Sequence, residues 1–332
     1  MTTITQATDR YLDSVYLARS ANTARTYRNA LSAFFAVLTE KRLLPDETPV
    51  QELSEDAIVW FANSLKRNAP ATERLYLTAV TGLYEYLAAE HLAEINLPRL
   101  RLLIRQRARR PGQRLPQFPQ NDIENALKYA NDLADLPGAD LEADDDARNE
   151  YLRNLRDRAF LLTLADTGLR VHEACNLRRG DIDWNEGKSL VIGKGDQQAV
   201  IRFSHRSLGA LRDYLNARAR IDGASGRPLG SLPVFARHDR GAGKQVKPIS
   251  TTTGRNIVAQ RVGEALGAEA VGTITPHSFR HYFVTTVLLG SGGNLKLAQE
   301  LARHKNIAVT QRYAHLSDDE LDRGYHEIFE QD

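Results

Sequence analysis

Apolar residues recur at helical spacing along about the first 100 residues of the chain. This periodicity predicts one helix at 3–18, a second from Ser20 to about Glu40, a third after Ser54 and a fourth from about Pro70. Ser20 and Ser54 stand directly before apolar periodic segments, so each is expected to cap the helix that follows it. The pattern therefore indicates a bundle of four or five helices.

Helical periodicity returns at Asn121, and after an acidic stretch at 132–150 it is interrupted by a short region of period two and by a Gly/Pro/Ser-rich stretch at 221–248. Two runs with a period of two, Lys188 to Ile192 and Gln198 to Phe203, are joined through a glycine-rich turn, which predicts a β-hairpin. The expected fold class is mainly α with a small antiparallel β-sheet. The remaining segments are predicted as helices at 155–178 (broken by a turn at Thr167 and Gly168), 206–220, 251–266, 277–290, 294–303, 307–314 and 317–329.

An arginine-rich, proline-containing segment separates these two parts. The net charge is only +2, but residues 105–118 hold five arginines and no acidic residue. The segment could be a solvated linker, or a connector lying along a phosphate backbone, where each cation releases counterions. We expect a helical domain at 1–104, a linker at 105–118 and a second domain at 119–332. The cations available to a phosphate backbone are Arg105, Arg107, Arg109 and Arg110.

Other features of composition narrow the class of protein. The single cysteine, Cys175, excludes a disulfide framework and a cysteine-based metal site within one chain. The first residues lack the pattern of a signal peptide, and no apolar run approaches a membrane span of about 18 residues. A cytoplasmic protein without membrane contact is expected. The acidic stretch 132–150 cannot easily face an anionic partner, so it is predicted to be an outward loop.

Arginine and threonine gather on the polar faces of the second and fourth predicted helices. One interpretation is an ordinary solvated helix face. The other is a pair of helices laid in a DNA groove, where these side chains reach phosphates and base edges. The DNA-binding candidates on these faces are Thr23, Arg25, Thr26, Arg28 and Arg74.

Six residues in the second domain together supply the chemistry of phosphoryl transfer to a tyrosine. Guanidinium groups fit the two non-bridging oxygens of a phosphate, a lysine can protonate the leaving 5′-oxygen, and a histidine can accept a proton. A tyrosine, with a pKa near 10, becomes a useful nucleophile only beside such groups. The candidates are Arg170, Lys194, His277, Arg280, His304 and, as nucleophile, Tyr313.

These motifs resemble the tyrosine recombinases, the phage integrase family that includes the Xer-type recombinases. The resemblance rests on the blocks Thr167–Glu173, Gly193–Gly195, His277–His281 and Arg303–His304 with Tyr313 nine residues on, and on Ser20–Tyr27 in the first domain. It implies a core-binding (SAM-like) domain and a catalytic domain forming a C-shaped DNA clamp. It also implies a 3′-phosphotyrosyl intermediate and a Holliday junction, formed without metal, ATP or other cofactor.

The resemblance further implies a homotetramer on two inverted-repeat DNA sites, with or without a second recombinase, that integrates, excises or resolves DNA. Two departures stand out: Arg303 occupies a position where glycine is usual, and the hairpin lacks a second lysine. We expect neither to touch the core chemistry, although Arg303 should alter how its helix packs. Two other hypotheses stay open, a type IB topoisomerase and a DNA-binding accessory protein without catalysis.

Overall fold

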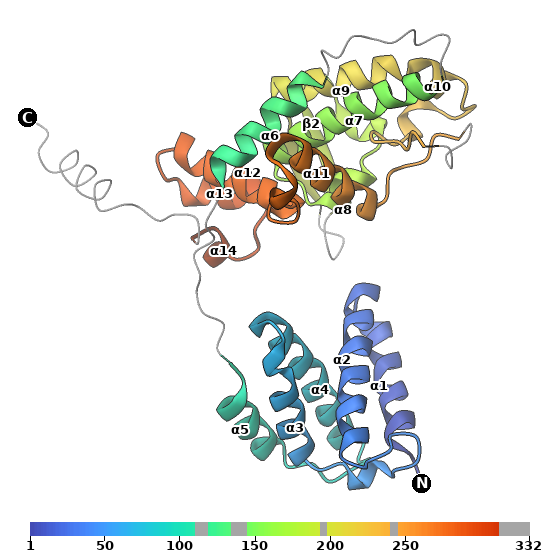
Figure 1. Ribbon diagram of the computed structural model, residues 1–332, viewed down its shortest axis with the longest axis vertical. Coiled ribbons are helices and arrows are strands. Elements are labelled where there is room, and N and C mark those ends of the chain that lie inside the picture. Colours follow the sequence, from blue (N-terminus) through green and yellow to red (C-terminus); the bar gives the residue numbers. More distant parts are fainter. Residues whose placement is uncertain (110–118, 134–144, 193–197, 240–244, 312–332) are drawn as a thin grey trace, which may run out of the picture. The chain divides into compact units, whose positions relative to one another are not determined.

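A computed structural model describes residues 1–109, 119–133, 145–192, 198–239 and 245–311. The chain divides into two compact units, Met1–Arg114 and Leu115–Asp332, each of which has its own hydrophobic core (Figure 1). The division falls inside the arginine-rich segment.

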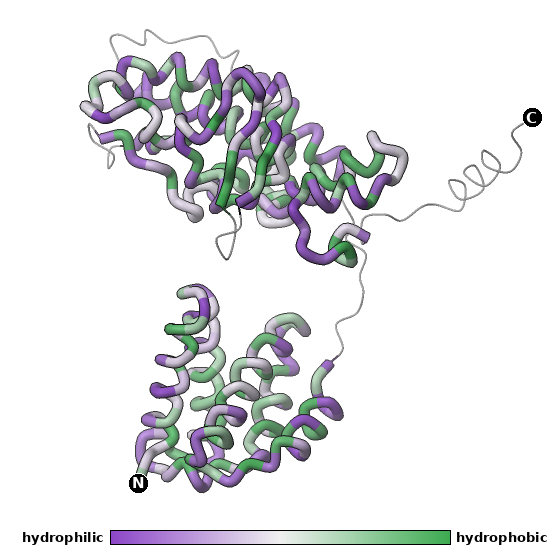
Figure 2. The backbone as a smooth tube through the Cα atoms, turned by 180° about the vertical axis from the view of Figure 1, so that it is seen from behind, coloured by the Kyte–Doolittle hydropathy of each residue, from purple (hydrophilic) through white to green (hydrophobic). Residues whose placement is uncertain are grey.

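The first unit is the helical bundle that the apolar periodicity predicts. In its core α2 packs against α4, and α3 packs against α5. Figure 2 shows apolar positions recurring along the helices of this unit. Its elements are α1 (Ile4–Ala18), α2 (Ala21–Glu40), η1 (Val50–Glu52), α3 (Asp56–Ser64), η2 (Leu65–Arg67), α4 (Pro70–Ala89) and α5 (Leu97–Arg107).

Aromatic packing and helix caps specify this bundle. The Phe34 ring meets the edge of Phe61 with centroids 5.2 Å apart, and both side chains are fully buried. Ser20 caps α2 as predicted, because its Oγ accepts a hydrogen bond from the backbone N–H of Thr23. Ser54 does not cap α3, so that prediction is wrong. Glu55 is the residue before α3, which begins at Asp56, and the carbonyl oxygen of Ser54 accepts a hydrogen bond from the hydroxyl of Tyr84 at 2.7 Å.

The helix α5 extends further than the predicted domain boundary at residue 104. Arg105 and Arg107, placed in the linker by the sequence pattern, lie on the last turn of α5. The reason is that Leu100 on this helix is fully buried and Leu103 and Ile104 pack on the core of the bundle. Packing of this apolar face keeps the basic residues helical.

The second unit is built around the long helix α7, which packs against α6, α9 and α12. Phe160 of α7 lies fully buried with its ring 5.0 Å from Phe235. The helices are α6 (Gln120–Asp132), α7 (Asp145–Thr167), α8 (Val171–Asn176), α9 (His205–Ala217), α10 (Ala219–Gly223), α11 (Thr251–Leu266), α12 (Pro276–Gly290), α13 (Leu295–Ala302) and α14 (Ile307–Gln311), with short 3-10 turns η3 (Arg179–Asp181), η4 (Leu229–Ser231) and η6 (Ala268–Ala270).

A three-stranded antiparallel sheet completes the unit, in the order β1 (Ile182–Asp183), β2 (Lys188–Ile192) and β3 (Gln198–Arg202). The register pairs Lys188 with Arg202 and Ile192 with Gln198, which confirms the predicted hairpin. The connection that carries Lys194 lies outside the described residues.

The acidic stretch 132–150 is not one loop, which corrects the prediction. Its first residue ends α6 and its residues from 145 onward form the first turns of α7, while 134–144 lie outside the described residues. Asp146 lies in the first turn of α7, where the helix dipole favours negative charge.

Candidate active site

The candidate site forms where the turn between α7 and α8 meets α12 and the end of α13. Gly168 makes the turn possible because its φ is +60°, a left-handed conformation that side chains disfavour. A Cβ at this position would overlap the ring of Phe283 on α12. The close approach places the carbonyl oxygen of Gly168 beside two guanidinium groups, those of Arg280 and Arg303.

Arg170 opens α8 and is held there by Glu173. Its backbone N–H and its Nη1 each donate to one oxygen of this carboxylate, both at 2.9 Å. Glu173 is thus the anionic partner of Arg170, although the Arg170 side chain stays 44% exposed. None of the described residues accepts a hydrogen bond from Nε or Nη2 of Arg170, and the side chain is partly exposed, so these two donors are available to a ligand.

The carboxylate of Glu173 is buried yet ionised. Burial alone would raise its pKa, but the charge of Arg303 and the hydrogen bonds from Arg170 outweigh burial and hold the pKa below the ordinary value. A fixed negative charge therefore lies beneath Arg170 at neutral pH.

Arg280 is buried on α12 and joins two segments that are distant in sequence. Its guanidinium donates to the carbonyl oxygens of Gly168 and Ala302, at the α7–α8 turn and at the end of α13. His277 lies one turn earlier on the same helix, as its spacing predicts, and its imidazole packs edge-on to that of His281 with centroids 4.3 Å apart. Burial and then the charges of Arg280 and Arg170 lower the pKa of His277.

His304 follows the end of α13 and points its ring at α14. Its Nδ1 shares a hydrogen bond with the hydroxyl of Thr310 at 2.9 Å, and its backbone N–H donates to Gln299. Burial, followed by the charges of Arg280 and Arg170, lowers the pKa of His304 to about 4. The ring is therefore neutral at physiological pH, and its remaining nitrogen is available as a donor or acceptor.

The structure thus brings together four of the six predicted residues: Arg170, His277, Arg280 and His304. The other two, Lys194 and Tyr313, lie outside the described residues. The α14 helix is described as far as Gln311, two positions before Tyr313.

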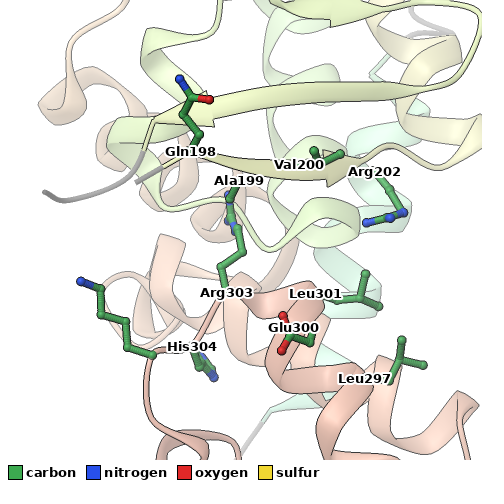
Figure 3. A pocket seen from close by; sticks show the side chains of 10 residues that line it. Gln198, Ala199, Val200, Arg202, Leu297, Glu300, Leu301, Arg303 and His304 are labelled. Carbon is green, nitrogen blue, oxygen red and sulfur yellow. The ribbon is translucent and has the colours of Figure 1, made fainter. Parts of the chain in front are cut away.

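The contacts of Arg303 were not predicted from the sequence. Its Nη2 donates to both the Gly168 carbonyl and the Glu173 carboxylate at 3.2 Å, so the side chain lies beside Arg170 and Arg280, while the expectation that it stays outside the core chemistry remains a prediction. In Figure 3 its side chain extends toward β3 and Ala199, while His304 points away from the sheet. Both residues line a hollow of about 780 Å³ between β3 and α13. The one feature of the sequence that pointed to this residue is the arginine at a position where the family usually has glycine.

In the first unit, most of the predicted DNA-binding residues lie on α2 or along α4 and α5. Arg25 and Arg28 are exposed on α2, where Thr26 bonds the backbone of its own helix. Arg74, Arg105 and Arg109 line one groove of about 430 Å³ between α4 and α5. Thr23 takes part in the cap of α2, and Arg110 lies outside the described residues.

Arg109 is not free in that groove. Its Nε pairs with the buried carboxylate of Glu73 at 2.5 Å, and its backbone N–H donates to the same carboxylate at 2.9 Å. Lys66 shares Glu73 and also donates to the carbonyl of Arg107. This cluster fastens the start of the arginine-rich segment to the bundle.

Comparison with known proteins matches both parts of the chain. Residues 143–320 match the phage integrase family, and residues 8–91 match the phage integrase N-terminal SAM-like domain. The chain belongs to the phage integrase family of tyrosine recombinases. The recombinase has the fold class expected from its sequence, and as a family member it is a DNA breaking and rejoining enzyme.

Curated relatives match along almost the whole recombinase. It is 30% identical over 324 residues to tyrosine recombinase XerD of Mycobacterium tuberculosis (strain CDC 1551 / Oshkosh), covering 94% of each chain. It is also 30% identical over 322 residues to XerD of Pseudomonas aeruginosa, covering 93% of this chain and 92% of the relative. Tyrosine recombinase XerC of Mycobacterium sp. (strain JLS) is 28% identical over 325 residues, covering 96% and 95%.

Solved structures share the fold. The XerH site-specific recombinase bound to palindromic difH substrate matches with a TM-score of 0.66 and 17% identity, covering 99% of this chain and 85% of that one. A lambda integrase dimer bound to a COC′ core site matches with a TM-score of 0.61 and 19% identity, covering 94% and 95%. Among the described residues of the recombinase, no helix is both long and apolar enough to cross a membrane.

Proposed function

We propose that the recombinase cuts each DNA strand with Tyr313 and that Arg170, Lys194, His277, Arg280 and His304 assist. The observation that carries this proposal is that Arg170, Arg280 and two neutral histidines cluster near the Gly168 turn, although they come from segments distant in sequence. Tyr313 follows the described end of α14 by two residues, and Thr310 of α14 bonds His304. This connection ties the segment that leads to the nucleophile to the rest of the site.

The chemistry follows from the groups present. The phenol oxygen of Tyr313 attacks phosphorus and loses its proton to the neutral imidazole of His277. The bond from phosphorus to the 5′-oxygen breaks, and Lys194 protonates that oxygen. Arg170 and Arg280 offset the charge that grows on the non-bridging oxygens, and His304 donates a hydrogen bond to one of them. The phosphotyrosyl bond retains the energy of the broken bond, so a 5′-hydroxyl can reverse the reaction.

The first unit supplies the other half of a C-shaped clamp in this proposal. The exposed arginines of α2 and the α4–α5 groove suit phosphate contacts, which position a protein on DNA. We propose an inverted-repeat target and a homotetramer that pairs two sites through a Holliday junction, with a second recombinase as an optional partner, in the cytoplasm. The titles of the similar solved structures, which name palindromic and core-site DNA, support the kind of target.

Covalent capture tests the proposal. The protein is incubated with fragmented host DNA in EDTA and denatured, and the DNA that remains attached is sequenced, with Tyr313→Phe as the control. Adducts at one inverted-repeat sequence, absent in the control, are the expected result. Adducts that survive Tyr313→Phe would overturn the assignment of the nucleophile. Scattered adducts would point to relaxation of topoisomerase type, and DNA binding without adducts would point to an accessory protein.

A further inference from the structure

Arg303 occupies an unfavourable backbone conformation in the middle of the site. Its φ of 58° and ψ of 44° end α13 in the left-handed region, where glycine is the favoured residue. An arginine there strains the backbone, and unusual backbone strain at a site is a reason to look for a functional role.

The Arg303 guanidinium is also costly to bury. Its side chain is 11% exposed, and none of the described residues accepts a hydrogen bond from its Nε or Nη1. Burial and then the nearby charge of Arg170 lower its pKa, whereas Glu173 acts in the opposite direction. Arg170 and Arg303 therefore place two positive charges beside one carboxylate, Glu173, which offsets only one of them.

Glu173 connects the two arginines. Its Oε1 accepts from Nη1 of Arg170, and its Oε2 accepts from the Arg170 backbone and from Nη2 of Arg303. Without Arg303, Oε2 would be free to take a second hydrogen bond from the Arg170 fork, because arginine and carboxylate favour a two-bond pairing. Such pairing would use a second nitrogen of Arg170, which would then no longer be available to the phosphate.

We propose that Arg303 is a positioning residue that holds Glu173 so that Arg170 pairs with it through one nitrogen and offers the rest of its fork to the scissile phosphate. The inference rests on the proposed function and adds a residue to it. The Gly168 carbonyl strengthens the arrangement, because it accepts hydrogen bonds from both Arg303 and Arg280 and so holds Arg303 beside the second phosphate-binding arginine.

The test compares two replacements of arginine by glycine at left-handed positions. Arg303→Gly removes the guanidinium and the backbone strain together. Arg42→Gly removes strain of the same kind at an exposed residue of the first unit, where φ is 66°. Both variants should gain thermal stability. Single-turnover cleavage is then measured on a nicked duplex carrying the sequence that the wild-type chain captures covalently.

We expect Arg303→Gly to lower the cleavage rate at saturating DNA on the order of 10- to 100-fold, with little change in the DNA concentration for half-saturation. Arg42→Gly should cleave at the wild-type rate. Millimolar methylguanidinium should restore part of the rate of Arg303→Gly only. Arg303→Asn, which tolerates the left-handed conformation, should behave like Arg303→Gly, and Arg303→Lys should fall between Arg303→Gly and the wild type.

A double-mutant cycle separates positioning from a purely structural role. If Arg303 acts through Glu173, adding Arg303→Gly to Glu173→Gln should cost no further rate. Full additivity, or a wild-type rate in Arg303→Gly, would overturn the inference while Tyr313 adducts still form. A wild-type chain that forms no adduct would instead overturn the proposed function, and the inference with it.

Discussion

Gly168→Ala is the most demanding test of the site geometry. The residue combines a φ of +60° with a carbonyl that accepts from Arg280 and Arg303, and an added Cβ would overlap the Phe283 ring. Gly226→Ala is the matched control, because Gly226 lies in the same unit at φ +68° and a Cβ there meets nothing within 4 Å. The two substitutions share the backbone cost, and only the first adds a clash.

The expected loss of stability is the sum of the backbone cost and the cost of the clash. A left-handed alanine costs about 1–2 kcal/mol of the free energy of unfolding, so Gly226→Ala should lose about that amount. Overpacking typically adds about 1–3 kcal/mol, so Gly168→Ala should lose about 2–5 kcal/mol in all. Relief of the clash moves the turn that carries both arginine contacts. Because a displacement of about 1 Å can cost on the order of 100-fold in rate, cleavage should fall by that order in Gly168→Ala alone.

The assay follows urea unfolding of the second unit by the fluorescence of Trp184. All variants carry Trp60→Phe, so that the first unit, which holds the other of the two tryptophans, is silent. Cleavage is measured in a single turnover on the captured DNA sequence.

Equal loss of stability in the two variants would refute the packing argument. A wild-type cleavage rate in Gly168→Ala would refute the claim that the Gly168 turn sets the arginines.

Three further predictions concern Arg280, His238 and Glu73. Arg280→Lys should lower the cleavage rate on the order of 100-fold or more, because a lysine cannot reproduce the planar fork that joins two carbonyls, whereas retained cleavage would contradict the role; gel-shift binding should change little. Burial, reinforced by the charges of Arg156 and Arg218, lowers the pKa of His238 to about 3 from 6.5, so the fold favours the neutral ring. The free energy of unfolding should therefore fall as the pH drops through this interval, by about 2 kcal/mol between pH 7.5 and 5, and urea titrations of His238→Gln should show a shallower pH dependence. Glu73→Gln should release Arg109 and steepen the salt dependence of DNA binding by about one counterion, while costing about 1–3 kcal/mol of stability in the first unit; an unchanged slope in fluorescence-anisotropy titrations would show that Arg109 makes no phosphate contact.

Helix positions and catalytic residue types were readable from the sequence because both depend on local spacing. The periodicity placed α2 and α12 within a residue or so, and the cap at Ser20 was identified correctly. His277 and Arg280 share one helix face because of their spacing of three residues alone. The cap at Ser54 was predicted wrongly because α3 begins at Asp56, so that Glu55 and not Ser54 is the residue before the helix.

Contacts between distant residues were beyond the reach of the sequence. The pairing of Arg109 with Glu73 across 36 residues ties a presumed linker residue to the bundle. The extension of α5 through Arg107 likewise depends on which apolar side chains find a core. In both cases burial in the bundle, and not local preference, determined the structure.

The sequence by itself therefore determined which groups are available for the chemistry and in what order they occur along the chain. Only the tertiary structure decided that Arg303 lies over Glu173, more than a hundred residues away in sequence. The physical reason is that two helices end at the same place. Arg303 follows α13 in a left-handed conformation, and its guanidinium reaches the carbonyl of Gly168 in the turn that follows α7. Spacing along the sequence does not predict such a contact between distant segments.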